Sequence, residues 1–128
     1  MLRMLTTTMT AAVLLGLIAG SALSADVKKG KKVFNKCKAC HVADKEKNKV
    51  GPHLVGMFGR KAGTVEGFKY SKAMKDSGIE WSAETLTQYL KKPKDYVPGT
   101  KMVFAGLKKD SQIENLIAYL EEATKKAE

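Results

Sequence analysis

Two cysteines and a histidine stand within five residues of one another, in the run Cys37-Lys38-Ala39-Cys40-His41. The 128-residue chain has no other cysteine and one other histidine. On a helical turn, residues i, i+3 and i+4 project from one face, so the two thiols and the imidazole can reach one object together. The spacing C-x-x-C-H is the attachment signature of a c-type haem. It predicts thioether bonds from Cys37 and Cys40, with His41 directed at the iron.

The same residues fit other chemistries less well. A thioredoxin-like redox pair belongs in a βαβ context, which the sequence pattern lacks. A zinc site would need Cys37, Cys40 and His41 to converge with a fourth ligand such as His53, and adjacent Cys40 and His41 suit one tetrahedron poorly. A disulfide between the cysteines would close a small strained loop. Haem attachment is therefore the favoured interpretation, and His53 is expected to be a surface histidine with no ligand role.

The N-terminus has the pattern of an export signal. Arg3 gives a positive start, residues 11–19 are apolar, and small residues follow as far as Ala25. We predict a signal peptide over residues 1–25 that is cleaved after Ala25, with Ala22 as the alternative, and a single domain over residues 26–128. The apolar run is too short to cross about 30 Å of hydrocarbon, so a membrane anchor is disfavoured. The expected location is the periplasm.

Apolar periodicity predicts an all-α fold with three main helices. The first is expected to begin near Val27, the second to begin at Ser82 and stop at Pro93, and the third to begin at a capping box of Ser111 and Glu114. Their inward faces would be Gly30, Val33, Phe34 and Cys37, then Leu86, Tyr89 and Leu90, then Ile113, Leu116, Ile117 and Leu120. A short helix is expected over residues 70–76. Residues 51–67, with five glycines, and residues 94–109 are expected to be ordered loops packed on a large apolar object.

An iron held by one histidine has a sixth position, and a thioether there would make an electron carrier. Three methionines follow the signal: Met57, Met74 and Met102. Met74 falls in the short helix, where filling the core is the ordinary role. Met102 lies in the turn-rich segment 98–102 and can swing toward the iron. Met102 is therefore the predicted ligand, and Met57 is the second choice.

Over residues 26–127 the chain resembles the small class I cytochromes c, in particular bacterial cytochrome c2 and its mitochondrial relatives. The segments that carry the resemblance are residues 30–34, 37–41, 51–54, 58–60, 78–81, 89–90, 98–106 and 116–120. The resemblance implies a small cytochrome c fold, in which three main helices, short helices and loops wrap one covalently bound haem c. It also implies a one-electron carrier without enzymatic activity.

The resemblance assigns roles to further residues. The carbonyl of Pro52 would accept the Nδ1 proton of His41, and the hydroxyl of Tyr89 would bond the sulfur of Met102. The groups around the haem propionates would be Arg60, Tyr70, Trp81 and Thr100, and the haem-packing residues would be Leu54, Leu90 and Phe104. The chain departs from the family pattern at Met74, where relatives usually carry a polar residue, and in the short stretch 42–50.

The charge distribution indicates where partners dock. The net charge is +10, and the excess is uneven: residues 26–61 carry 11 basic and 3 acidic side chains, whereas residues 62–90 carry 3 and 4. We expect six lysines to ring the exposed haem edge: Lys36, Lys49, Lys94, Lys101, Lys108 and Lys109. They would steer a monomer to acidic surfaces of redox complexes, such as a bc1-type donor and a reaction centre or terminal oxidase, in transient and salt-sensitive contacts. Nucleic acid is not expected as a partner, because no aromatic platform accompanies the lysines.

Overall fold

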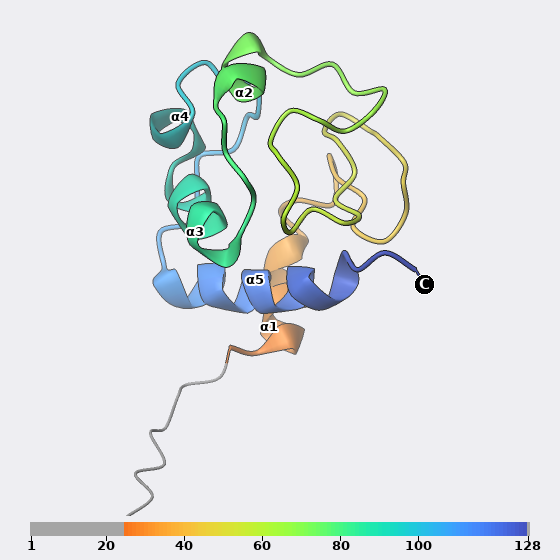
Figure 1. Cartoon of the computed structure of the whole chain (residues 1–128). Helices are drawn as coiled ribbons and strands as arrows, with labels where there is room; N and C mark the ends of the chain where they lie inside the picture. The colour runs from red at the N-terminus through yellow and green to blue at the C-terminus, as the bar shows by residue number, and fades with distance from the viewer. Residues whose placement is uncertain (1–24, 128) are drawn as a thin grey trace, which may run out of the picture.

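The computed structural model describes residues 25–127 (Figure 1). The predicted signal peptide, apart from Ala25, lies outside these residues. The helices are α1 (Val27–Phe34), α2 (Lys72–Asp76), α3 (Ala83–Lys91), α4 (Pro93–Tyr96) and α5 (Asp110–Ala123). The described part of the chain has no strand, only one isolated bridge between Lys61 and Glu80. The expected all-α class is confirmed. In residues 25–127, no helix combines the length and apolarity needed to cross a membrane.

Helices α1 and α5 cross at one end of the molecule (Figure 1). Gly30 faces α5 so closely that a Cβ atom there would overlap the carbonyl of Asn115. Beside this contact the rings of Phe34 and Tyr119 pack with centroids 5.4 Å apart. Asp26 caps α1 by accepting a hydrogen bond from the amide of Lys29 at 3.0 Å. The glycine thus permits the backbone contact that fixes the first and last helices together.

Helix α3 begins where the sequence predicts. The Ser82 side chain accepts from the amide of Thr85 at 3.1 Å, and the Thr85 hydroxyl accepts from the amide of Ser82 at 2.9 Å, which is a complete capping box. Pro93 ends α3 and also opens α4, because its fixed φ and missing N–H suit the first position of a helix. The expected loop over residues 94–109 therefore starts with a helical turn.

The start of α5 differs from the prediction. The helix begins at Asp110 with Lys109 as N-cap and no side-chain cap, and exposed Ser111 lies inside its first turn. Tertiary contacts explain the earlier start: Leu107 is only 2% exposed, and its amide donates to the carbonyl of Leu90 at 2.8 Å. The chain thus enters the helix anchored on α3. The inward face is as expected, with Ile113, Leu116, Ile117 and Leu120 all buried.

Candidate functional site

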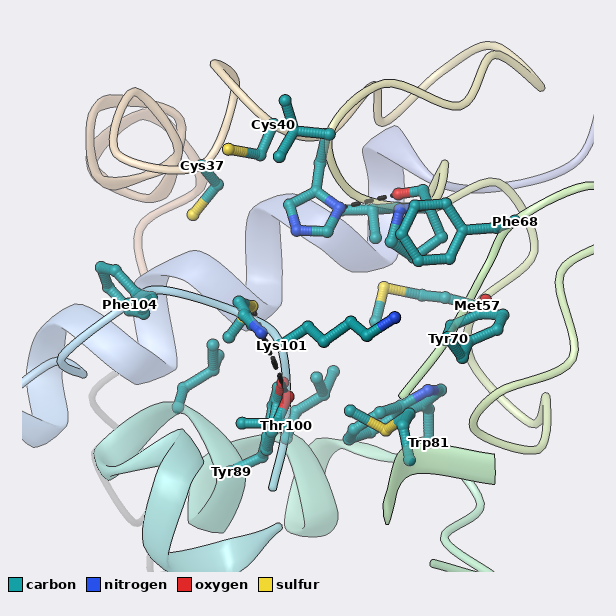
Figure 2. Close-up of a pocket in the computed structure, with 18 of the residues that line it drawn as sticks. Cys37, Cys40, Met57, Phe68, Tyr70, Trp81, Tyr89, Thr100, Lys101 and Phe104 are labelled. Carbon is teal, nitrogen blue, oxygen red and sulfur yellow. Dashed lines mark hydrogen bonds between the residues drawn. The ribbon is translucent and has the colours of Figure 1, made fainter. Parts of the chain in front are cut away.

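A cavity of about 270 Å³ separates the loops over residues 36–70 from α3 and the segment 97–104 (Figure 2). Each residue assigned above to haem attachment, iron ligation or haem contact lines this cavity. The chain therefore brings together side chains that lie up to 67 positions apart in the sequence, from Cys37 to Phe104. This cavity can hold the large apolar object that the long loops predict.

The two cysteines stand side by side on one edge of the cavity (Figure 2). Past the end of α1 the chain keeps turning, and the amide of His41 donates to the carbonyl of Cys37 at 2.9 Å. This turn puts Cys37, Cys40 and His41 on one side, as the i, i+3, i+4 spacing predicts. Both thiols are free.

The thiol of Cys37 is held in its neutral form. Burial raises its pKa to about 11, and the neighbouring Cys40 adds to the effect. Within residues 25–127 no three His, Cys, Asp or Glu side chains are placed to hold a metal ion together. The structure thus supplies no ligand set for the zinc alternative.

The imidazole of His41 is fixed from two sides. Its Nδ1 lies 2.7 Å from the carbonyl oxygen of Pro52, so Nδ1 carries the proton and Nε2 is left free. Burial lowers the pKa of His41, against a smaller opposite effect of the Pro52 carbonyl, and this favours the neutral ring. Gly51 packs flat against the ring, because a Cβ atom there would overlap it. The sequence marks Gly51 only as part of a motif, and the contact depends on folding.

Met102 lines the cavity from the segment 97–104, in which Thr100 lies across the cavity from Cys40 (Figure 2). The hydroxyl of Tyr89 lies 3.7 Å from its sulfur and 3.4 Å from the hydroxyl of Thr100. Thr100 in turn accepts from the amide of Met102 at 3.3 Å. Burial raises the pKa of Tyr89, so its hydroxyl stays protonated and can donate. These contacts tie an otherwise irregular segment to α3.

Met57 and Met74 also line the cavity, and both are buried. Figure 2 shows the sulfur of Met57 turned into the cavity. Among the described residues, however, the sulfur of Met102 is the one that receives a hydrogen bond. This hydrogen bond is the contact by which the sulfur of Met102 differs from that of Met57 in the described residues.

Arg60 shows what kind of group the cavity suits. Its half-buried guanidinium donates to the carbonyls of Val55 at 2.9 Å and His53 at 3.3 Å. Burial lowers its pKa, and in the described part of the chain no carboxylate pairs with it. A half-buried cation without an anion fits a ligand that brings carboxylates. Haem, with two propionates and a large apolar face, matches both Arg60 and the apolar lining.

Tyr70 and Trp81 lie near each other in the cavity wall (Figure 2). The hydroxyl of Tyr70 accepts from the amide of Val65 at 3.1 Å, and burial raises its pKa. Trp81 is 9% exposed and packs on Tyr89 with ring centroids 5.1 Å apart. His53 is partly exposed, and its Nδ1 accepts from the amide of Val55 at 3.2 Å.

The cavity mouth holds some of the expected lysines and some unexpected residues. Lys36 and Lys101 line it, and Lys49 is nearby, with its ammonium donating to the carbonyl of Lys38 at 3.0 Å. Lys94, Lys108 and Lys109 are exposed but do not line the cavity. Sequence reasoning gave no site role to several residues of the lining, among them Val50, Phe68, Lys69, Ser71 and Val103. Val50 and Val103 are 78% and 93% exposed, so the mouth has an apolar rim among its lysines.

Comparison with known proteins identifies the family. The family model for cytochrome c matches residues 27–124. The chain belongs to the cytochrome c family. It is 56% identical over 101 residues to cytochrome c-550 of Nitrobacter winogradskyi, covering 78% of this chain and 93% of the relative. It is 55% identical over 102 residues to cytochrome c type-1 of Ascaris suum, covering 79% and 91%.

A solved structure agrees with these relatives. Cytochrome cH from Methylobacterium extorquens is 47% identical and superposes with a TM-score of 0.71, covering 75% of this chain and 97% of its own. Cytochromes c bind covalently attached haem c and are electron-transfer proteins, not enzymes. This protein is accordingly a haem c electron carrier with the cytochrome c fold.

Proposed function

We propose that this cytochrome carries single electrons through a haem attached at Cys37 and Cys40, with His41 and Met102 as axial ligands. The observation that carries the proposal is that one cavity is lined both by His41, bonded to a carbonyl, and by Met102, bonded to a hydroxyl. With both axial positions filled by the chain, no substrate needs to reach the iron. When bound, the haem supplies the one-electron redox chemistry of its iron.

The chain's own residues set the conditions for this transfer. His41 and a thioether together favour the ferrous state and raise the potential. The donor hydroxyl of Tyr89 withdraws electron density from the sulfur of Met102 and acts in the same direction. Arg60, Tyr70, Trp81 and Thr100 are proposed to receive the propionates. Leu54, Leu90 and Phe104 exclude water from the haem faces, and a site already fully coordinated changes little between redox states.

A reduced-minus-oxidised absorption spectrum of the purified protein tests the proposal, combined with a denaturing gel stained for haem. We expect a ferrous c-type spectrum and haem that stays with the chain on the gel. The Cys37→Ser and Cys40→Ser double variant should lose the covalent haem. A colourless protein, or haem retained covalently by the double variant, would contradict attachment at these residues.

We further propose that Lys36, Lys49, Lys94, Lys101, Lys108 and Lys109 steer the protein to acidic surfaces of membrane redox complexes. Lys36 and Lys101 at the cavity mouth support this most directly, beside exposed Val103. Electron-transfer rates to a purified bc1-type or oxidase partner should fall as ionic strength rises. Lys36→Gln and Lys101→Gln should slow transfer more than Lys94→Gln or Lys108→Gln. Rates independent of salt would refute steering.

Export completes the proposed function. Signal cleavage after Ala25 would leave Asp26 at the start of the mature monomer, where its nitrogen donates to the side-chain oxygen of Asn115 at 2.8 Å. This hydrogen bond supports the proposed boundary, because it holds the first residue of the proposed mature chain on α5. Mass spectrometry of the protein from a periplasmic extract should give Asp26 as the first residue. A cytoplasmic chain that keeps residues 1–25 would contradict export.

A further inference from the structure

The peptide group between Pro52 and His53 is held at both of its ends. Its carbonyl oxygen lies 2.7 Å from Nδ1 of His41. Its N–H donates to Oδ1 of Asn48 at 3.0 Å. The Asn48 amide nitrogen then donates to the carbonyl of Glu66 at 3.1 Å. Three hydrogen bonds therefore run head to tail from the imidazole of His41, through two amide groups, to a backbone carbonyl in another loop.

Such a chain strengthens each of its members. When an amide N–H donates, its own oxygen becomes more negative and accepts more strongly. Asn48 accepts from the N–H of His53, so it makes the oxygen of Pro52 a better acceptor for His41. A stronger acceptor on Nδ1 makes the imidazole a more basic ligand through its other nitrogen. The donation from Asn48 to Glu66 acts in the same direction on Asn48 itself.

We propose that Asn48 is a positioning residue that sets the electron-donating strength of His41 through the peptide group of Pro52 and His53. This inference rests on the proposed ligation of the iron by His41. Asn48 makes no hydrogen bond to His41 and lies outside the C-x-x-C-H motif. Its side chain supplies both an acceptor for the N–H of His53 and a donor for the carbonyl of Glu66.

Asn48 also holds two loops together. The test must therefore separate an effect on the electron-donating strength of His41 from a purely structural role. Asn48→Ala loses both hydrogen bonds. Asn48→Asp keeps an acceptor for the N–H of His53, now a charged one, but loses the donor to Glu66. Both variants remove the tie between the loops and should lose stability. Only the tuning role predicts that they move the midpoint potential in opposite directions.

The experiment measures the midpoint potential of the haem-loaded variants together with the NMR signal of the Nδ1 proton of His41. We expect Asn48→Ala to raise the potential, because a weaker donor stabilises the ferric iron less, and Asn48→Asp to lower it. In Asn48→Ala the amide of His53 should exchange about fivefold faster, the effect of one lost hydrogen bond. The Nδ1 proton should shift in opposite directions in the two variants.

A matched control removes the general effect of charge. Lys47→Gln changes the net charge by the same amount as Asn48→Asp, at an exposed neighbouring position. The inference is overturned if both Asn48 variants shift the potential in one direction, or if Asn48→Asp shifts it no further than Lys47→Gln. Should Asn48→Ala fail to fold, the comparison of Asn48→Asp with Lys47→Gln decides alone.

The parent protein distinguishes this inference from the proposed ligation. If His41 ligates the iron, its ring signals are shifted by the unpaired electron of the ferric state. Shifted ring signals with a potential that does not respond to Asn48 would overturn only the role of Asn48. Ring signals without such a shift would overturn the ligation, and the role of Asn48 with it.

Discussion

The two walls of the cavity hold their proposed ligands in different ways. His41 is held by backbone: its Nδ1 lies 2.7 Å from a carbonyl, and Gly51 packs against its ring. Met102 is held by side chains: the hydroxyl of Tyr89 lies 3.7 Å from its sulfur. Its neighbour Val103 is 93% exposed, and the segment around it is irregular.

This difference follows from the chemistry of the two ligands. An imidazole has a second nitrogen that can donate to a carbonyl, so the backbone can fix its orientation. A thioether sulfur is only a weak acceptor, and a backbone carbonyl can do nothing for it. The Met102 wall therefore depends on one tyrosine and on packing. We therefore expect the contacts of Met102 to be lost before those of His41 when the protein is destabilised.

The largest effect is expected from Met102→Ala. Loss of the thioether should open the sixth position and lower the midpoint potential by a few tenths of a volt, part of the roughly 0.8 V range that axial ligands span. Redox titration followed by absorption measures the change. Met57→Leu is the control, because it removes the other cavity sulfur, conserves volume and should cost less than about 1.5 kcal/mol. A large drop in Met57→Leu alone would assign the ligand to Met57.

Gly51→Ala tests how firmly the backbone holds the imidazole of His41. The added methyl would overlap the imidazole, so the ring or the backbone must shift, at a cost of about 1–3 kcal/mol. Denaturant unfolding and redox titration should show both lower stability and a changed potential. Gly59→Ala is the control: Gly59 has φ +84° and no neighbour within 4 Å of a Cβ, so only backbone strain of about 1–2 kcal/mol is added. An altered potential in Gly59→Ala would show that the contact with His41 is not the cause.

Tyr89→Phe removes the one hydroxyl that reaches Met102. The sulfur then donates more strongly to the iron, so the potential should fall, but by less than in Met102→Ala. Stability should change by about 0.5–1.5 kcal/mol, the ordinary range for one hydrogen bond. Redox titration and thermal unfolding measure the two effects. An unchanged potential would mean that the contact of 3.7 Å does not tune the ligand.

The smallest expected effect is a dependence of stability on pH that comes from His53, the residue after Pro52. Burial lowers the pKa of His53, helped by positive Arg60 and Lys126 and opposed by Glu46. The unfolded chain therefore takes up the proton first, so His53 supports the fold fully above about pH 6.5 and less as the pH falls below it. Unfolding followed between pH 7.5 and 5 should show this loss. His53→Asn should weaken the dependence, and an equal slope in both proteins would rule out His53 as the source.

The sequence predicts most of this fold because its signals are local. The capping residues of α3 and the inward faces of α3 and α5 follow from neighbours within four positions along the chain. The start of α5 does not, because burial of Leu107 against α3 decides it and Ser111 is left inside the helix. Pro93 correctly predicts where α3 ends, but the sequence pattern does not show that α4 begins at the same residue.

The site is predictable where one motif or a resemblance carries it, as for Cys37, Cys40 and His41. Contacts between distant loops carry no local signal. The contact of Gly51 with His41 and the bonds of Asn48 arise only when residues 40–66 fold back on themselves. The same holds for the mouth: Lys69 lines the cavity, whereas Lys94, Lys108 and Lys109, chosen from charge along the chain, do not.

Proton NMR of the ferrous protein tests most directly whether the two walls supply His41 and Met102 to one iron. A thioether methyl bound above the haem plane lies in the ring current of the porphyrin, which shifts its signal far upfield. We predict one such methyl signal, present in the parent protein and in Met57→Leu and lost in Met102→Ala. A shifted methyl signal that persists in Met102→Ala would contradict the account.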